Sequence, residues 1–288
     1  MSQPITRRGF LNLSAKTVVG AALGSLGLLE YAAFESVWFK LTHMTLPLTG
    51  LPNAFEGLVL AHLSDLHFNP WTTPERFAEV VKMVNAQSPD VVAITGDFID
   101  ARTPEAQFPQ IIEQLGRLEA EFGVFAVLGN HDHWRDAALV RELLGKSSVQ
   151  ELPNRAFPIH RDGEVLTICG LDDVMENMQD LPALLADMPE SGCAILLVHE
   201  PDFADTISPI GRFALQLSGH SHGGQVSIPF YGPPVTPRLA QNYPRGLYQV
   251  GEMMLYTSTG LGMVPPLLRL NCRPEAAVFT LMGKPPGS

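Results

Sequence analysis

The chain has 288 residues, a mass of 31.4 kDa and 45% hydrophobic residues, which is enough to bury the core of one large domain. Its 30 acidic and 19 basic residues give a formal charge of -11, and an acidic body has no general attraction for a nucleic-acid backbone, so no nucleic-acid partner is expected. The three cysteines, Cys169, Cys193 and Cys272, form no CxxC pair and are expected to be small buried residues.

Residues 1–34 have the features of an export signal. Arg7 and Arg8 precede Phe10, Leu11 and a weakly hydrophobic stretch, which resembles a signal read by the twin-arginine export machinery. The uncharged run of residues 17–29 is shorter than the roughly 20 residues that span a bilayer, and no clean cleavage site follows it. We therefore expect export across the inner membrane, with the protein periplasmic or anchored through its N-terminus and facing outward. A disordered basic tail before an amphipathic helix is the alternative.

The predicted elements then follow in chain order. Residues 35–56, which contain LPLTGLP, are expected to be a linker, residues 57–282 one domain, and residues 283–288 a flexible tail. VLAHL and VVAITGD are apolar strands, and TTPERFAEVVKMVNAQ between them predicts an amphipathic helix capped by Thr73 with Pro74 at its first position. EAQFPQIIEQLGRLEA, FGVFAV and RDAALVRELLGKS continue as helix, strand and helix. Such a series implies parallel strands whose carboxyl ends meet at one edge of a sheet.

The second half of the chain predicts a further mixed sheet. RAFPIHRDGEVLTICGL favours a hairpin that turns at Asp162 and Gly163. CAILLVHEPD and LQLSGHSHGGQ are strands that end in histidines, and GLYQVGEMMLYTSTGLG and AAVFTL supply further short strands. We expect this sheet to pack on the first, with helices outside both.

Five predicted strand ends carry side chains of the types that bind metal ions in proteins. They hold Asp65 and His67; Asp97 and Asp100; Asn130, His131 and Asp132; His199; and His220 and His222. Carboxylate, carboxamide and imidazole without thiolate suit divalent ions such as Mn, Fe, Zn or Co. The seven candidate ligands among these ten residues are too many for one ion and are about right for two ions that share a carboxylate. Two such ions can bind the attacking and leaving oxygens of a displacement at phosphorus.

The blocks D-x-H, G-D-x-x-D, G-N-H-D, H and G-H-x-H, in this order, resemble the calcineurin-like metallophosphoesterase superfamily. The resemblance runs from Gly57 to Leu281. YPRGLYQVGEMMLYTSTGLG, Arg269 and Pro274-Glu275 resemble a bacterial branch that is exported or attached to the membrane. The resemblance implies an α+β fold of the α/β type, a four-layer αββα sandwich of two mixed β-sheets flanked by helices.

The resemblance also implies the role of each site residue. One metal ion would be held by Asp65, His67 and His222, the other by Asn130, His199 and His220, with Asp97 bridging them. His131 would stabilise the transition state or protonate the leaving oxygen, and Asp100 would hold the other ring nitrogen of His131. The nucleophile implied is a metal-bound water or hydroxide. Asp132 is expected to cap the following helix, His62 to be structural, and Gln225 to be an outer donor of the metal site.

The function expected is a dinuclear metal-dependent hydrolase of phosphate esters, a phosphodiesterase more than a monoesterase. Apolar residues around the motifs could instead favour a lipid-linked phosphate or pyrophosphate, as in UDP-diacylglucosamine pyrophosphohydrolases, or they could pack on each other. They are Phe68, Pro70, Trp71, Ile228, Phe230, Tyr231 and Met263 to Leu268. A catalytically silent metal-binding scaffold is the alternative from another class.

Overall fold

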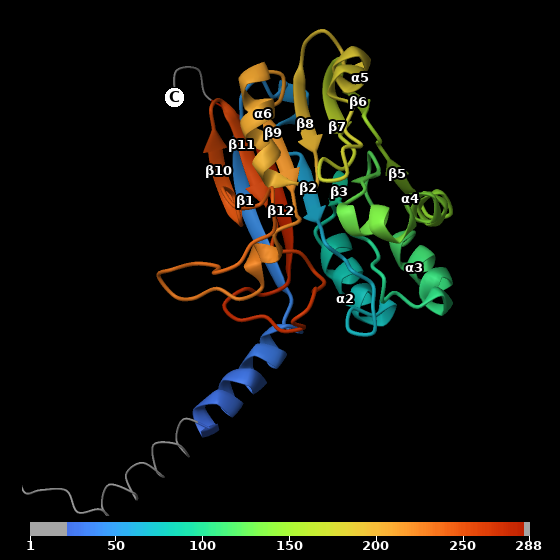
Figure 1. Cartoon of the computed structure of the whole chain (residues 1–288). Helices are drawn as coiled ribbons and strands as arrows, with labels where there is room; N and C mark the ends of the chain where they lie inside the picture. Colours follow the sequence, from blue (N-terminus) through green and yellow to red (C-terminus); the bar gives the residue numbers. More distant parts are fainter. Residues whose placement is uncertain (1–21, 285–288) are drawn as a thin grey trace, which may run out of the picture.

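The computed structural model describes residues 22–284, and its core is two six-stranded sheets packed face to face with helices outside both (Figure 1). The expected four-layer αββα sandwich is confirmed. The helices are α2 (Pro74–Asn85), α3 (Phe108–Leu115), α4 (Asn130–Gly145), α5 (Leu181–Asp187), α6 (Ala204–Ile207) and one over residues 22–35. The strands are β1 (Lys40–Leu48), β2 (Val59–Leu63), β3 (Val91–Thr95), β4 (Val124–Val127), β5 (Val149–Glu151), β6 (Arg155–Arg161), β7 (Glu164–Gly170), β8 (Cys193–Leu197), β9 (Leu215–Ser218), β10 (Gly246–Val250), β11 (Met253–Thr257) and β12 (Glu275–Gly283).

Both sheets are mixed, with parallel strands at their centres. The first has the order β1-β12-β2-β3-β4-β5, in which β2 to β5 are parallel and β12 runs antiparallel to β2. The second has the order β10-β11-β9-β8-β7-β6, in which β11, β9, β8 and β7 are parallel. The carboxyl ends of the parallel strands therefore meet at one edge of each sheet, as ligand sites of such sheets require.

Three apolar clusters hold the layers together. The one between the sheets takes alternate residues of the strands, so that in β8 Ile195 and Leu197 face the first sheet while Leu196 faces helices α5 and α6. α2, α3 and α4 cover the other face of the first sheet through residues such as Phe77 and Ile111. Each fully buried leucine or isoleucine stabilises the fold by about 1.5–3 kcal/mol, which makes the two sheets a rigid support for the loops at their edge.

The prediction of a linker over residues 35–56 is wrong, because most of this segment is an ordered part of the first sheet and of the core. β1 pairs in parallel with β12 from Lys40 to Leu48, and Leu46 and Leu48 are fully buried in the cluster between the sheets. Pro47 is compatible with this strand because β1 lies at the edge of the sheet, where a missing backbone N–H can go unpaired. Gly283, which was expected to begin the C-terminal tail, is the last residue of β12, and residues 285–288 of that expected tail lie outside the described residues.

Two local expectations are confirmed and one changes. The predicted helix α2 begins after Thr73, whose side chain accepts the backbone N–H of Arg76. The hairpin of β6 and β7 turns at Asp162 and Gly163, both in the left-handed region. The motif expected in a loop after β4 instead forms the first turn of α4, which begins at Asn130, separated from the end of the strand by two residues, and is interrupted by a kink at Asp136.

The paired arginines of the expected export signal lie outside the described residues. Within the described part of the chain, no helix has both the length and the apolar character needed to cross a bilayer. The helix over residues 22–35 projects from one end of the sandwich (Figure 1).

Candidate metal centre

The backbone at the strand ends is held in an unusual conformation. Asp65, His67, Asp97, His220 and His222 all have φ between 40° and 66°, the left-handed region that costs non-glycine residues energy. Such conformations persist only where the surrounding structure enforces them, and here they aim five candidate ligands at one place.

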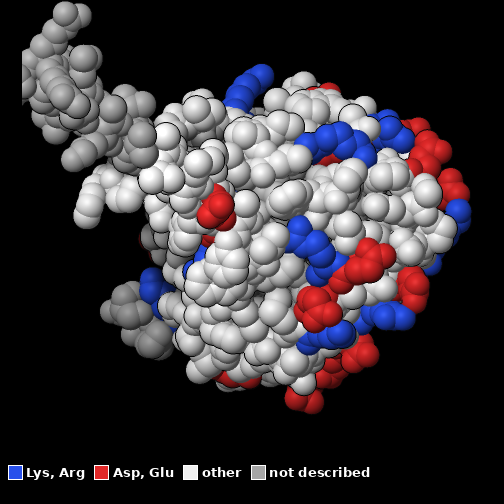
Figure 2. All heavy atoms as spheres, turned by 90° about the horizontal axis from the view of Figure 1, so that it is seen from below, with Lys and Arg blue, Asp and Glu red and all other residues white. Residues whose placement is uncertain are grey.

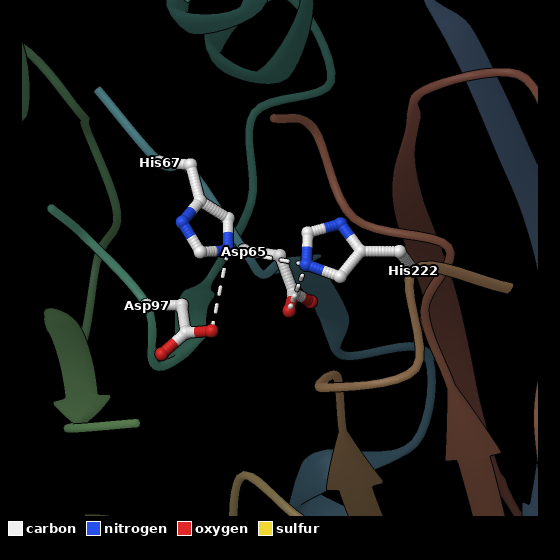
Figure 3. A group of neighbouring side chains, drawn as sticks. All are labelled: Asp65, His67, Asp97 and His222. Atoms are coloured by element: carbon white, nitrogen blue, oxygen red, sulfur yellow. Dashed lines mark hydrogen bonds and ion pairs between the residues drawn. The ribbon is translucent and has the colours of Figure 1, made fainter. Parts of the chain in front are cut away.

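Four of these side chains form the centre of the site (Figure 3). One ligand atom from each of Asp65, His67, Asp97 and His222 lies within 4.8 Å of those of the other three, and all four residues are buried. Nε2 of His67 lies 3.1 Å from Nε2 of His222 and 3.2 Å from Oδ2 of Asp97. Nε2 of His222 lies 3.4 Å from Oδ1 of Asp65. The residues come from the ends of β2, β3 and β9 and are remote in the sequence.

The three remaining expected ligands lie on the other side of Asp97. Nε2 of His199 is 3.3 Å from Oδ2 of Asp97, so this carboxylate oxygen faces the rings of both His67 and His199. The ring centroids of His199 and His220 are 4.9 Å apart. Asn130 begins α4 and lines the same cavity as His220 and Asp97. All seven candidate ligands thus surround one site.

Hydrogen bonds fix which ring nitrogen His199 and His220 present to the site. Nδ1 of His199 lies 2.6 Å from the carbonyl oxygen of Thr95, so Nε2 is its free nitrogen. Nε2 of His220 lies 2.8 Å from the carbonyl oxygen of Arg238, so Nδ1 is its free nitrogen. Such partners orient metal-binding imidazoles and set their tautomers.

The charges of the site are strongly coupled. Burial alone would raise the pKa of Asp97, but the neighbouring His199 and His67 hold it well below its usual value. Burial opposes the charged form of His67, yet Asp97 and Asp100 raise its pKa to about 9. Burial and the charge of His67 together hold the pKa of His222 well below its usual value. Burial likewise opposes the charged form of His199, yet Asp97 holds its pKa well above the usual value, so positive charge on His67 and His199 flanks the carboxylate of Asp97.

The donor set fits divalent metal ions. Two imidazole Nε2 atoms face each other beside two carboxylates, an arrangement that a shared cation explains better than hydrogen bonds alone. Nε2 of His199 and Oδ1 of Asn130 are buried and have no hydrogen-bond partner, although buried polar atoms normally find one. Both atoms are accepted ligand types for Mn, Fe or Zn.

The expected role of Asp100 is wrong. This carboxylate does not hold His131: its Oδ2 lies 3.5 Å from Nδ1 of His67 and 2.6 Å from a guanidinium nitrogen of Arg102. Its Oδ1 also accepts the backbone N–H of Arg102 at 2.7 Å. The tight turn after β3 folds Asp100 back towards the end of β2. Asp100 therefore supports the candidate metal ligand His67, and it does not contact His131 as expected.

His131 lies at the edge of the site, facing the cavity. Its backbone N–H donates to Oδ1 of Asp97 at 2.9 Å, and its ring packs edge-on against His67 with centroids 4.7 Å apart. On the other side its ring lies 4.7 Å from that of Trp134. Burial lowers the pKa of His131, so the ring is neutral at neutral pH in the metal-free protein. His133 points elsewhere, with Nε2 2.8 Å from Oδ1 of Asp172.

A cavity of about 570 Å³ leads from the candidate ligands to the surface. Polar residues of the site form its floor, and its outer wall is mostly apolar, built from Val226, Pro234, Val235, Pro237, Val264, Pro265 and Pro266. Of the apolar residues expected around the mouth, Val264, Pro265 and Pro266 line the cavity, whereas Phe68 is buried against Phe77. Gln225 does not support a metal ligand: its amide binds the backbone of Val264 and Pro266 and holds that wall in place.

Residues that the sequence interpretation underrated support the site. Asp132 is more than a helix cap, because its carboxylate accepts the backbone N–H groups of Gly129, Phe98 and Ile99 and so joins the ends of β3 and β4. Burial raises its pKa to about 7. Glu200, next to His199, is buried and accepts the backbone N–H groups of Val174 and Met175. The position of Glu200 directly after the motif residue His199 was the feature of the sequence that could have identified it.

The glycine that precedes the third motif allows the strand ends to approach each other. A Cβ at Gly129 would lie 2.8 Å from both the backbone nitrogen of Asp97 and Cε1 of His199, and closer still to Oδ1 of Asp97. We expect Gly129→Ala to lower the free energy of unfolding by about 1–3 kcal/mol, as overpacking typically does. Thermal denaturation measures this. Gly145→Ala is the control, because its Cβ meets nothing within 4 Å and alanine favours the helix, so an equal loss in both variants would contradict the explanation.

Comparisons with known proteins identify several that are similar to this chain. A family model described as calcineurin-like phosphoesterase matches residues 58–224. The chain is 34% identical over 289 residues to the uncharacterized metallophosphoesterase YkuE of Bacillus subtilis, which covers 96% of this chain and 98% of that protein. It is 29% identical over 284 residues to the phosphodiesterase YaeI of Escherichia coli, in an alignment that covers 96% of this chain and 100% of that protein. Among solved structures, the sulfate thiohydrolase SoxB of Thermus thermophilus matches with a TM-score of 0.48 and 14% identity, over 73% of this chain and 53% of that one.

Proposed function

The chain belongs to the calcineurin-like phosphoesterase family, and from this premise we propose that it is a dinuclear metal-dependent phosphodiesterase. Membership supports a hydrolase that uses divalent metal ions, and the similarity to the phosphodiesterase YaeI favours diesters as substrates. The observation that carries the proposal is the position of Asp97, whose Oδ2 faces His67 on one side and His199 on the other. A carboxylate between two sets of ligands is what a pair of ions requires.

The residues sort into two sets around Asp97. Asp65, His67 and His222 would hold one ion, and Asn130, His199 and His220 the other. Two divalent ions, when bound, activate water and neutralise the charge of a phosphate. This would allow an acidic protein to attract an anionic substrate, because the local charge outweighs the net charge of the chain.

The protein itself orients these groups and handles the leaving alcohol. Asp100, held by Arg102, fixes the ring of His67, and the carbonyl oxygens of Thr95 and Arg238 fix His199 and His220. The ring of His131 lies at the cavity beside His67, where an N–H can be donated to a phosphoryl or leaving oxygen.

The test is hydrolysis by the full chain after loading with Mn²⁺, Zn²⁺ or Fe²⁺. We expect the protein to cleave bis-p-nitrophenyl phosphate faster than p-nitrophenyl phosphate, to hold about two ions per chain by elemental analysis, and to lose activity on chelation. Adding the metal back should restore the activity. A protein that binds metal and cleaves neither ester would be the silent scaffold, and the proposal would fail.

A further inference from the structure

Exposed apolar side chains gather at the end of the molecule from which the helix over residues 22–35 projects. This helix exposes apolar side chains on all sides along its length, among them Leu23, Leu26, Leu28, Leu29, Tyr31 and Phe34. A helix that is apolar all round is normally buried in protein or lipid. Only its last turn is fastened to the domain, where buried Glu35 accepts the backbone N–H groups of Asn271 and Cys272.

A second apolar projection lies at the same end. The loop of residues 226–237 turns tightly where Ile228 and Gly232 bridge, which places Phe230 and Tyr231 at its tip. Phe230 is completely exposed and Tyr231 is 75% exposed. In Figure 1 this loop projects between β10 and the N-terminal helix, beside the loop that contains residues 263–268. Leu267 in that neighbouring loop is also exposed.

Charge and aromatic residues at this end suit the surface of a bilayer. Figure 2, which looks onto this end, shows a broad uncharged area, with most of the charged side chains in view gathered on the right of the view. Where the helix ends, the guanidinium of Arg273 lies 3.7 Å from the ring centroid of half-exposed Trp38. Lys40 and Arg245 join Arg273 around a neighbouring cavity of about 300 Å³. Tryptophan and tyrosine prefer the membrane–water interface, and cations there meet anionic lipid headgroups.

We infer that helix 22–35 and the tip of loop 226–237 form a docking face for a lipid bilayer, which places the mouth of the metal-site cavity at the membrane surface. Val226, Val235 and Pro237 of the same loop line that cavity, so the apolar wall next to the candidate ligands is continuous with the docking face. The substrate is then a phosphodiester that carries an acyl chain, with its phosphate at the metal site and its chain along the wall. The identification of the reacting group as a phosphodiester rests on the proposed function, whereas the docking face does not.

Insertion of the loop can be measured separately from activity. Because the native cysteines are buried, a Phe230→Cys variant of the full chain can be labelled selectively with a fluorophore that brightens in apolar surroundings. With vesicles of phosphatidylethanolamine and phosphatidylglycerol we expect a blue shift and increased emission. Met282→Cys is the control, since Met282 is exposed near the end of β12, at the opposite end of the sandwich. No change at position 230, or an equal change at both positions, would overturn the docking face. A change that appears without vesicles and grows with protein concentration would assign the face to a second copy of the chain.

The substrate class is tested by a double variant, Phe230→Asp with Tyr231→Asp. We expect about tenfold slower hydrolysis of a labelled phosphatidylglycerol in vesicles and an unchanged rate on soluble bis-p-nitrophenyl phosphate. Equal rates for both proteins on the vesicle substrate would overturn the inference, as would a wild type that cleaves only the soluble ester. If the label at position 230 responds to vesicles while neither ester is cleaved, the proposed function fails and the docking face remains.

Discussion

Replacing Asp97 with asparagine should abolish hydrolysis. The loss should exceed the roughly 10- to 100-fold effect of removing an outer partner of a metal site, because the shared carboxylate is removed from both ions. Asparagine has the same shape and tolerates the left-handed conformation that Asp97 adopts, so the variant removes the charge and keeps the backbone. Metal content by elemental analysis and kcat on bis-p-nitrophenyl phosphate measure the effect.

The control for Asp97→Asn is Asp162→Asn. Asp162 also has a left-handed backbone, with φ of 51° against 57° for Asp97, but it lies in the turn between β6 and β7. We expect normal metal content and activity in this control. Full activity of Asp97→Asn with two ions bound would exclude a bridging role.

Replacing His131 with alanine should lower kcat by about 10²- to 10⁴-fold, the range of a lost proton donor, while metal content stays near normal. The side chain faces the cavity, whereas the contact with Asp97 is made by the backbone nitrogen, which alanine keeps. Stopped assays under saturating substrate give kcat, and elemental analysis gives the metal content.

His133→Ala is the matched control, because His133 lies in the same turn of α4 and its ring binds Asp172 outside the cavity. We expect at most a small change in its kcat. Loss of metal from His131→Ala, or equal losses of kcat in the two variants, would contradict the assigned role of His131.

The apolar loops illustrate a limit of reading function from local sequence. Phe68 and Phe230 both follow metal-binding motifs and both are aromatic, yet one is buried against Phe77 and the other is fully exposed. Phe68 is placed inside by the pairing of its backbone with that of Phe98, and Phe230 is placed outside by a tight turn. Neither interaction has a periodic pattern that the sequence would reveal.

The segment before β2 shows a related limit. LPLTGLP, with two prolines and a glycine, predicts a linker here. Its strand conformation depends on β12, more than 230 residues later, which supplies the hydrogen bonds and the buried surface for Leu46 and Leu48. Long-range pairing of this kind is decided by the assembled sheet.

The sequence by itself determined the two-sheet sandwich and the convergence of seven candidate ligands, because parallel strands necessarily bring their carboxyl ends, and the polar residues that follow them, to one edge. Only the tertiary structure decided how these side chains are supported: Asp100 turns to His67 and Arg102, Asp132 joins two strand ends, and Gln225 holds the cavity wall. The physical reason is that strand periodicity fixes where a residue emerges from the sheet, whereas its partner depends on loop conformations set by contacts between segments remote in the chain.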